Sequence, residues 1–282
     1  AKMSHQRMLY AILAFSALVA GLMLWPQPPA AGLAGEGVVR DAHLGTSAPS
    51  ANPWRAYMPI IAHNDACAPV PGASYQTISV NPPPSDRPAE QHADLNLSLR
   101  GYSATTGYLG LVDYGGGSDP RAPQLAGLFA DRRTPIVRSV FRVYDWNWAC
   151  NCRGGLIAWP EVTLARLATT PGEIISAPSS GYDIGSGYTA LVLYAAQERL
   201  TLKYTREDNV VRGYTVHLEN LCVEPMLLAL YQAQNAGGRQ QLPALRGGQA
   251  IGCARETAIG VAIRDNGAFL DPRSRKDWWQ GR

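Results

Sequence analysis

This chain of 282 residues carries no large excess of positive charge. Its 25 Lys and Arg residues are nearly balanced by 22 Asp and Glu residues, so the formal net charge is only +3 at pH 7. Domains that bind nucleic acid gather basic side chains on one face, whereas the basic residues here are scattered until the C-terminus. We therefore expect no nucleic-acid partner.

Histidine is also scarce, and the common catalytic motifs are missing. The five His residues offer no convincing base for the serine pair 179–180, which lies outside a nucleophile-elbow pattern. Glycines 115–117 follow an expected strand, but no Lys or Ser/Thr completes a phosphate-binding loop. A carboxylate pair drawn from Asp113, Asp119 and Asp131 would suit glycoside hydrolysis, although acidic residues in polar turns are usually solvated. We expect no cofactor.

Long helical patterns are rare, while proline and glycine are abundant, at 21 and 28 residues. These two residue types favour short strands joined by many turns and argue against a helical bundle. The sequence predicts a mostly β fold, an antiparallel β-sheet or sandwich with one or two short helices. The convincing helix spans residues 225–234, with shorter candidates at 123–130 and 160–168. The expected strands are 54–61, 95–100, 108–114, 136–148, 188–195, 199–205, 210–218, 250–252 and 259–263, the last two within a run of β-hairpins over 242–272.

The N-terminus carries one long apolar run, residues 8–25, without a charged side chain. This length is at the short end of what spans a hydrocarbon core of ~30 Å. Basic residues before the run orient the N-terminus inside and the bulk of the chain on the extracytoplasmic side. We expect residues 1–25 to form an uncleaved transmembrane signal anchor; the alternative is a signal peptide cleaved near Ala30 and Ala31. Residues 26–53, rich in Pro, Ala, Gly and Ser, then form a linker.

Short segments in the last part of the chain follow one another in a characteristic order. They are TPGEII (170–175), GY (181–182), LVLY (191–194), HL (217–218), RGGQAIG (246–252), VAIRDNG (261–267) and DP (271–272). In this order the chain resembles the β-domain of lysostaphin-type zinc endopeptidases over about residues 165–272. The resemblance implies a β-sheet domain of a family that cuts peptide cross-links of the cell wall, with a zinc ion held by two His and one Asp, and a further His assisting the chemistry.

The zinc ligands of that family have no counterpart at the matching positions. The family's last motif, His-x-His, falls on Ala258-Ile259-Gly260, and its earlier His followed by Asp is expected where residues 144–148 read YDWNW. A catalytic zinc site needs three protein ligands and a water molecule. Only His217 matches, at the position of the assisting His. The resemblance therefore implies a retained fold without the metal or the reaction; the alternatives are a hydrolase with ligands outside the matched region and a wall-binding module.

Aromatic side chains point to binding at two places. Tyr144, Trp146 and Trp148 alternate along one expected strand, so their rings would share a face. With His217, this is the candidate binding face for a sugar or a protein partner, and core filling is an equal alternative. The C-terminal tail combines cations with two Trp rings, which a free terminus rarely keeps uncovered. We expect the tail to dock against its own domain first and another subunit second, through Arg273, Arg275, Lys276, Trp278 and Trp279.

Five cysteines would be oxidised outside the cytoplasm, with one left over. Cys150 and Cys152 are too close in sequence to pair comfortably, so we expect each to bridge elsewhere. Cys222 and Cys253 flank the convincing helix and could pair with each other. A metal site built on Cys-x-Cys lacks a second pair of ligands, so we expect disulfides among Cys67, Cys150, Cys152, Cys222 and Cys253.

These features predict a membrane-anchored, extracytoplasmic protein, and we favour a role without catalysis. The expected regions are the anchor 1–25, the linker 26–53, a β-rich part 54–160 and a peptidase-like β-domain 161–282 that ends in the basic, Trp-bearing tail. The protein would act as a structural or accessory subunit of an envelope complex. Its partners would be the membrane, through residues 8–25, and other subunits of that complex, with peptidoglycan or another glycan as the alternative.

Overall fold

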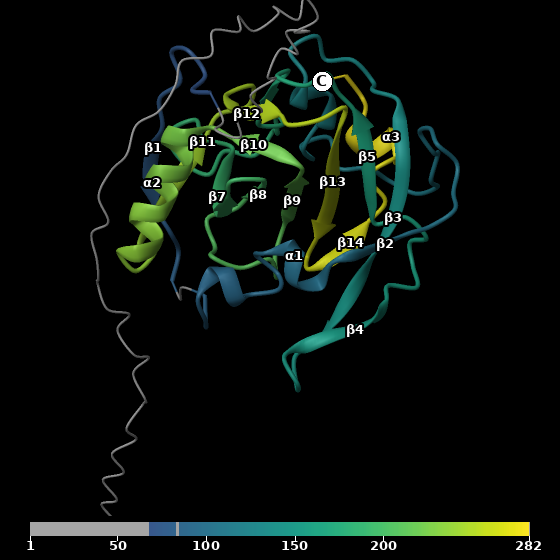
Figure 1. The fold of residues 1–282 in the computed structure, drawn as a ribbon, viewed down its shortest axis with the longest axis horizontal. Helices are drawn as coiled ribbons and strands as arrows, with labels where there is room; N and C mark the ends of the chain where they lie inside the picture. Colours follow the sequence, from purple (N-terminus) through teal and green to yellow (C-terminus); the bar gives the residue numbers. More distant parts are fainter. Residues whose placement is uncertain (1–67, 83–84, 282) are drawn as a thin grey trace, which may run out of the picture. The chain divides into compact units, whose positions relative to one another are not determined.

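Antiparallel strands dominate residues 68–82 and 85–281, which are the residues that the computed structural model describes. The larger sheet has 11 strands in the order β1-β11-β7-β8-β9-β13-β5-β3-β2, with β14 paired to β13 and β4 paired to β3 (Figure 1). A smaller sheet has the order β10-β12-β6. The prediction of a mostly β, antiparallel fold is confirmed for this part of the chain.

The strands alternate with few helical segments. The strands are β1 (Gln76–Ser79), β2 (Tyr102–Ala104), β3 (Val137–Asn147), β4 (Cys152–Leu156), β5 (Leu164–Ala168), β6 (Ile174–Ser176), β7 (Ala190–Ala196), β8 (Arg199–Lys203), β9 (Tyr214–Glu219), β10 (Leu221–Val223), β11 (Gln241–Leu245), β12 (Ala250–Ala254), β13 (Ala258–Asp265) and β14 (Ala268–Leu270). The α-helices are α1 (Leu97–Arg100), α2 (Pro225–Ala236) and α3 (Arg275–Trp278), and the short 3-10 helices are η1 (Ala89–Gln91) and η2 (Leu125–Leu128).

The core lies around the middle strands of the larger sheet. In β7 and β13 nearly every residue is buried, which explains why these strands read as continuous apolar runs rather than as an alternation. Strands from both sides of residue 160 share this sheet, because β1 pairs with β11 and β3 pairs with β5. The two stretches 54–160 and 161–282 therefore contribute to one sheet.

Helix α2 forms where the sequence predicts it. Pro225 begins its first turn, and the side chain of Glu224 accepts a hydrogen bond from the backbone N–H of Leu227 at 2.8 Å, which caps the free donors of the helix start. The helix buries Leu227 and Tyr231. After the helix, Arg239 forms a buried, two-pronged ion pair with Asp208 at 2.6 and 2.7 Å, so the end of α2 is fixed to the loop after β8.

Two of the expected elements have a different structure. The stretch 95–100 was predicted as a strand, but Leu97–Arg100 is helix α1. The reason is Asn96, whose side chain accepts a hydrogen bond from the backbone N–H of Ser98 and caps a helix. The stretch 108–114 forms a loop, with one isolated bridge between Val112 and Ser274. The predictions for these two stretches are therefore wrong.

The expected helix at 160–168 is also wrong, because its second half is strand β5. This strand lies between β3 and β13, with Leu167 opposite Val137 on one side and Ile259 on the other. Pairing on both edges supplies backbone hydrogen-bond partners to β5, and this tertiary advantage outweighs the helix-starting tendency of Pro160. The short helix expected at 123–130 is present as the 3-10 helix Leu125–Leu128.

The stretch 242–272 contains one hairpin rather than a series. Strands β13 and β14 pair around Asn266 and Gly267, which have φ angles of 47° and 84°. An Asn-Gly pair with positive φ at both residues is the turn that two-residue hairpins prefer. Strand β11 lies in the larger sheet and β12 in the smaller one, so β11, β12 and β13 do not form consecutive hairpins.

The cysteine predictions need correction. Cys150 and Cys152 form a disulfide with each other, with their Cα atoms 5.2 Å apart. The intervening Asn151 has a φ of 50°, and this turn conformation brings the two Cβ atoms together despite the short spacing. Cys253 lies opposite Cys222 in the smaller sheet but is a free thiol, whereas Cys222 is disulfide-bonded. Cys67 lies outside the described residues.

The predicted anchor 8–25, linker 26–53 and strand 54–61 also lie outside the described residues. Within the part of the chain that the structure describes, no helix combines the length and the apolar character needed to cross a membrane.

The C-terminal tail packs against its own domain, the first of the two partners expected for it. The indole N–H groups of Trp278 and Trp279 donate to the carbonyl oxygens of Asp271 and Pro272 at 2.8 and 2.9 Å, and both rings belong to the main core. Arg273 is buried and ion-paired with Asp271. Arg275 and Lys276 lie nearer the surface, where they contact Asp113 and the carbonyl oxygen of Gly117.

Because Trp278 is only 2% exposed, we expect Trp278→Ala to lower the free energy of unfolding by about 3–5 kcal/mol. Urea unfolding followed by circular dichroism measures this change. The matched control is Trp148→Ala, because Trp148 is 43% exposed and should cost less than about 1 kcal/mol. Equal losses in the two variants would contradict the docking of the tail.

Candidate functional site

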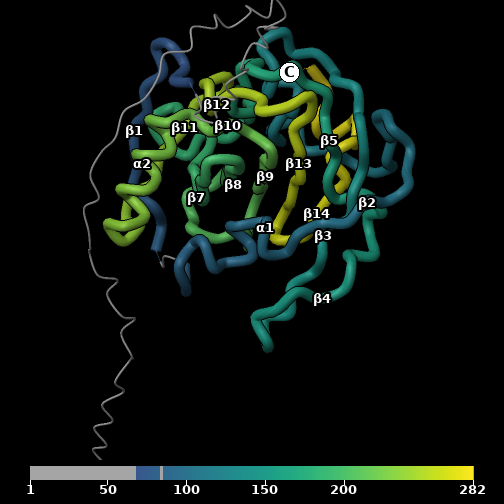
Figure 2. Tube along the Cα trace, in the orientation of Figure 1, coloured from purple at the N-terminus to yellow at the C-terminus, as the bar shows by residue number. Residues whose placement is uncertain are grey.

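Strand β5 lies between β3 and β13 along only the first part of each of these two strands. The first half of β13 pairs with β5, and its last residues, Ile263 to Asp265, pair instead with β14. In the same way β3 pairs with β5 through its first half and with β4 through Tyr144 to Asn147. The β3–β4 hairpin projects from the rest of the sheet (Figures 1 and 2). Strands β14 and β4 thus form two separate arms.

A cavity of about 470 Å³ opens between these arms. We call it the fork groove. Its walls are the end of β4 with the segment that follows, and the turn and first residues of β14. The lining residues are Arg100, Asp145, Gly155, Leu156, Ile157, Ala158, Trp159, Arg264, Gly267, Ala268 and Phe269.

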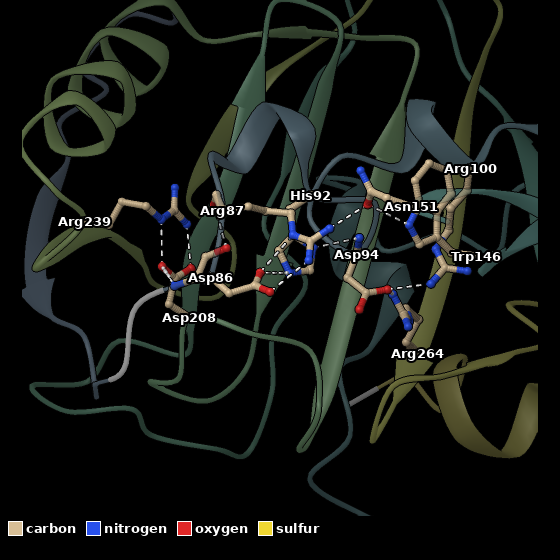
Figure 3. Close-up of polar contacts among 11 residues, drawn as sticks. Asp86, Arg87, His92, Asp94, Arg100, Trp146, Asn151, Asp208, Arg239 and Arg264 are labelled. Atoms are coloured by element: carbon tan, nitrogen blue, oxygen red, sulfur yellow. Dashed lines mark hydrogen bonds and ion pairs between the residues drawn. The ribbon is translucent and has the colours of Figure 1, made fainter. Parts of the chain in front are cut away.

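Two arginines, Arg100 and Arg264, form the floor of the fork groove, and Asp94, which is not part of the lining, joins them. Asp94 Oδ1 accepts a hydrogen bond from Arg100 Nη2 and another from Arg264 Nη1, both at 2.7 Å (Figure 3). Arg100 is the last residue of α1, and Arg264 comes from β13, so the cluster joins segments 170 residues apart in sequence. The side chains of Arg100 and Arg264 are 4% and 5% exposed, and that of Asp94 is 16% exposed.

Each guanidinium group is also held by backbone carbonyl oxygens. Arg100 Nε donates to the carbonyl oxygen of Ala93 at 3.1 Å, and Arg264 Nε donates to that of Gly267 at 2.8 Å. The ring of Phe269 lies beneath both, 5.6 Å from the Arg100 guanidinium carbon and 4.6 Å from that of Arg264. Cations over an aromatic face are stabilised by the ring quadrupole. These contacts fix both guanidinium groups at the floor.

The charged groups of the cluster shift one another's pKa values. Burial by itself raises the pKa of Asp94, but Arg264 and Arg100 outweigh burial, so the pKa lies below its usual range. Burial lowers the pKa of Arg264, with Asp94 opposing this effect and Arg100 adding to it. Asp145 is the next carboxylate, 3.4 Å from Arg100 Nη1, but its side chain is 72% exposed. Solvent therefore screens most of that attraction.

His217 lies in the core, on strand β9, and does not reach the aromatic rings with which it was grouped. Its ring stacks on Phe269 at 6.0 Å between centroids. The hydroxyl of Thr201 donates to the carbonyl oxygen of Leu95 at 2.6 Å, so its oxygen accepts from His217 Nδ1 at 3.0 Å. This assigns the proton to Nδ1. Burial, and then the charge of Arg264, hold the pKa of His217 well below its usual range, so the ring is neutral.

Of the three expected rings, Tyr144 and Trp146 lie on β3, and Trp148 follows the end of that strand. A register shift between Tyr144 and Trp146 interrupts the alternation. Trp146 and Trp148 contact each other at 6.4 Å between centroids, and Arg87 lies over the Trp148 ring at 5.0 Å. Tyr144 contacts Arg153 instead. The tip of the hairpin thus carries a Trp pair that contacts the segment before η1. Figure 3 shows Trp146 beside Asn151, whose side-chain oxygen accepts hydrogen bonds from Trp146 and Arg87.

Sequence reasoning missed the residues of the groove floor. Asp94 and Arg100 flank the leucine run that was interpreted as a strand, and Arg264 follows the apolar run of β13. The signal that could have found them is a charged residue beside buried apolar neighbours, because such charges are rarely buried without a partner. The pairing itself joins distant segments, so no local pattern could reveal it.

The positions that match the ligand motif of the zinc peptidases are buried in strand β13. Ala258 and Gly260 face β5 there. Among the residues that the structure describes, no three His, Cys, Asp or Glu side chains are arranged to hold a metal ion. Comparisons with protein-family models, with curated proteins and with solved structures found no match. The fold and the site therefore define a β-sheet protein with an arginine-floored groove.

We expect His217 to make stability depend on pH. The folded protein keeps His217 neutral, whereas the unfolded chain takes up a proton as pH falls below about 6.5. The free energy of unfolding should therefore fall, by at most about 1.4 kcal/mol per pH unit. Urea titrations of the wild type and His217→Gln between pH 8 and 5 measure this free energy. The difference between the free energies of unfolding of the two proteins should change as pH falls. Parallel curves would contradict a buried neutral His217.

Proposed function

We propose that the chain is a non-catalytic binding protein, anchored in a membrane through residues 8–25, whose extracytoplasmic β-domain takes an acidic peptide segment of a partner in the fork groove. In this proposal it serves as an accessory subunit of an envelope complex. The observation that carries the proposal is the charge of the groove floor, where two buried guanidinium groups share the carboxylate of Asp94.

The excess of buried positive charge is the first reason. Removing a charge from water is costly unless a counter-charge faces it. Asp94 compensates one guanidinium group, and Asp145 is too exposed to compensate the other fully. An anionic group entering the groove would supply the missing counter-charge, and two guanidinium groups are well suited to a carboxylate.

The shape of the groove is the second reason. Strand β14 pairs along one edge with β13, and β4 pairs along one edge with β3, so each arm presents its other edge to the space between them. Strand edges recognise extended peptides through backbone hydrogen bonds, with side chains adding specificity. An extended segment with a carboxylate side chain matches both the edges and the cationic floor.

The test is calorimetric binding of the peptide acetyl-Glu-Glu-Glu-amide to the full chain in mild detergent. We expect saturable binding that weakens when NaCl rises from 50 to 300 mM. Arg264→Gln should weaken binding at least tenfold, because Asp94 then remains paired with Arg100 and the excess charge is gone. Arg138→Gln is the matched control, since Arg138 lies exposed on β3, and it should bind like the wild type.

The proposal fails if acetyl-Lys-Lys-Lys-amide binds as tightly as the acidic peptide. It also fails if Arg264→Gln retains the affinity of the wild type, because the groove floor would then play no part in recognition.

A further inference from the structure

A second cavity, of about 360 Å³, adjoins the fork groove. Trp159, Ala268 and Phe269 line both cavities. We call this cavity the aromatic pocket. Its remaining lining residues come from the loop before η2, the segment after β4, the end of β14 and the C-terminal tail: Tyr114, Pro160, Leu270, Asp271, Ser274, Asp277 and Trp278.

The aromatic pocket is built from rings that meet at an angle. Tyr114 and Trp159 stand edge to face, with centroids 6.4 Å apart and planes at 86°. Trp159 is 73% exposed, which is unusual for a large ring beside a formed cavity. Phe269 and Trp278 are buried. The pocket therefore has a buried aromatic wall and one accessible ring face, the arrangement that small-molecule sites share.

The polar groups of the pocket are few and already charge-compensated. Asp271 is paired with Arg273 at 2.7 Å and accepts from the hydroxyl of Tyr114 at 2.8 Å. Asp277 is paired with Lys276 at 2.9 Å and accepts from Ser274 at 2.6 Å. Burial, and then the bond to Asp271, raise the pKa of Tyr114 to about 12, so its hydroxyl remains a donor.

These observations select a class of ligand. An organic cation would find the aromatic rings favourable, but both carboxylates already have cationic partners and leave no net negative charge to attract it. A carboxylate still has free lone pairs after such pairing and can accept further hydrogen bonds from hydroxyl groups. A neutral, hydroxyl-rich ring with an apolar face satisfies both the Trp159 surface and the carboxylate acceptors.

We propose that the aromatic pocket binds one pyranose residue of a neutral saccharide, with an apolar face of the sugar ring on Trp159 and its hydroxyl groups donating to Asp277. The volume suits one ring with its substituents, since it lies near the lower end of the range for small-molecule sites. This site is separate from the anion-binding floor of the fork groove and does not rest on the function proposed for it.

The experiment is isothermal titration of the full chain, in mild detergent, with cellotriose and with chitotriose, and in parallel with tetramethylammonium chloride. We expect at least one of the two saccharides to bind and tetramethylammonium not to bind. Trp159→Ala should weaken saccharide binding at least tenfold. Asp277→Asn, which keeps the shape but loses the charged acceptor, should weaken it about threefold to tenfold.

Two variants serve as matched controls. Trp148→Ala removes another exposed Trp, and Arg138→Gln removes an exposed cation on β3; both should bind the saccharide like the wild type. Thermal unfolding verifies that each variant folds, which is expected because Trp159 is mostly exposed. The proposal is overturned if neither saccharide binds, if tetramethylammonium binds in a manner that depends on Trp159, or if Trp148→Ala loses binding and Trp159→Ala does not.

Discussion

The structure depends on one carboxylate shared by two buried guanidinium groups. Asp94 contacts Arg100 and Arg264 at the same distance of 2.7 Å, and this cluster joins helix α1 to strand β13 beneath the fork of the sheet. Buried ion pairs stabilise weakly compared with apolar packing, but removing their shared partner is costly. Asp94 is therefore the residue that allows two positive charges to remain close together in the interior.

Strand β13, which carries Arg264, connects this cluster to the neighbouring strands of the larger sheet. One of its edges pairs with β9, and the other pairs first with β5 and then with β14. Beside this change of partner, β14 contributes Ala268 and Phe269 to the lining of both the fork groove and the aromatic pocket. The C-terminal tail completes the aromatic pocket, because Trp278 both fills the core and lines that cavity. Both candidate sites thus depend on the same short hairpin.

The sequence was informative where the signal was local. The continuous apolar run of β13, the long alternating strand β3 and the proline-started helix α2 were all predicted, because burial and capping leave patterns over a few residues. The predictions failed where long-range pairing decides the outcome. One local signal was also missed: leucines at alternating positions suggested a strand at 95–100, but Asn96 caps a helix there, and Arg100 at the end of that helix reaches Asp94. The floor of the groove could not be predicted, because it forms only when strands distant in sequence become neighbours.

Arg264 provides excess charge, whereas Asp94 holds the structure together, and this division of roles can be measured. The most direct measurement is the free energy of unfolding of Asp94→Asn and Arg264→Gln, determined side by side by urea titration at pH 7. The account predicts a loss of about 3–5 kcal/mol for Asp94→Asn, which leaves two buried cations unpaired. We expect a smaller loss, of about 1–2 kcal/mol, for Arg264→Gln, because Arg100 still pairs with Asp94 while the hydrogen bond to the carbonyl oxygen of Gly267 is lost. Equal, large losses in both variants would contradict it, since both arginines would then be needed for the fold alone.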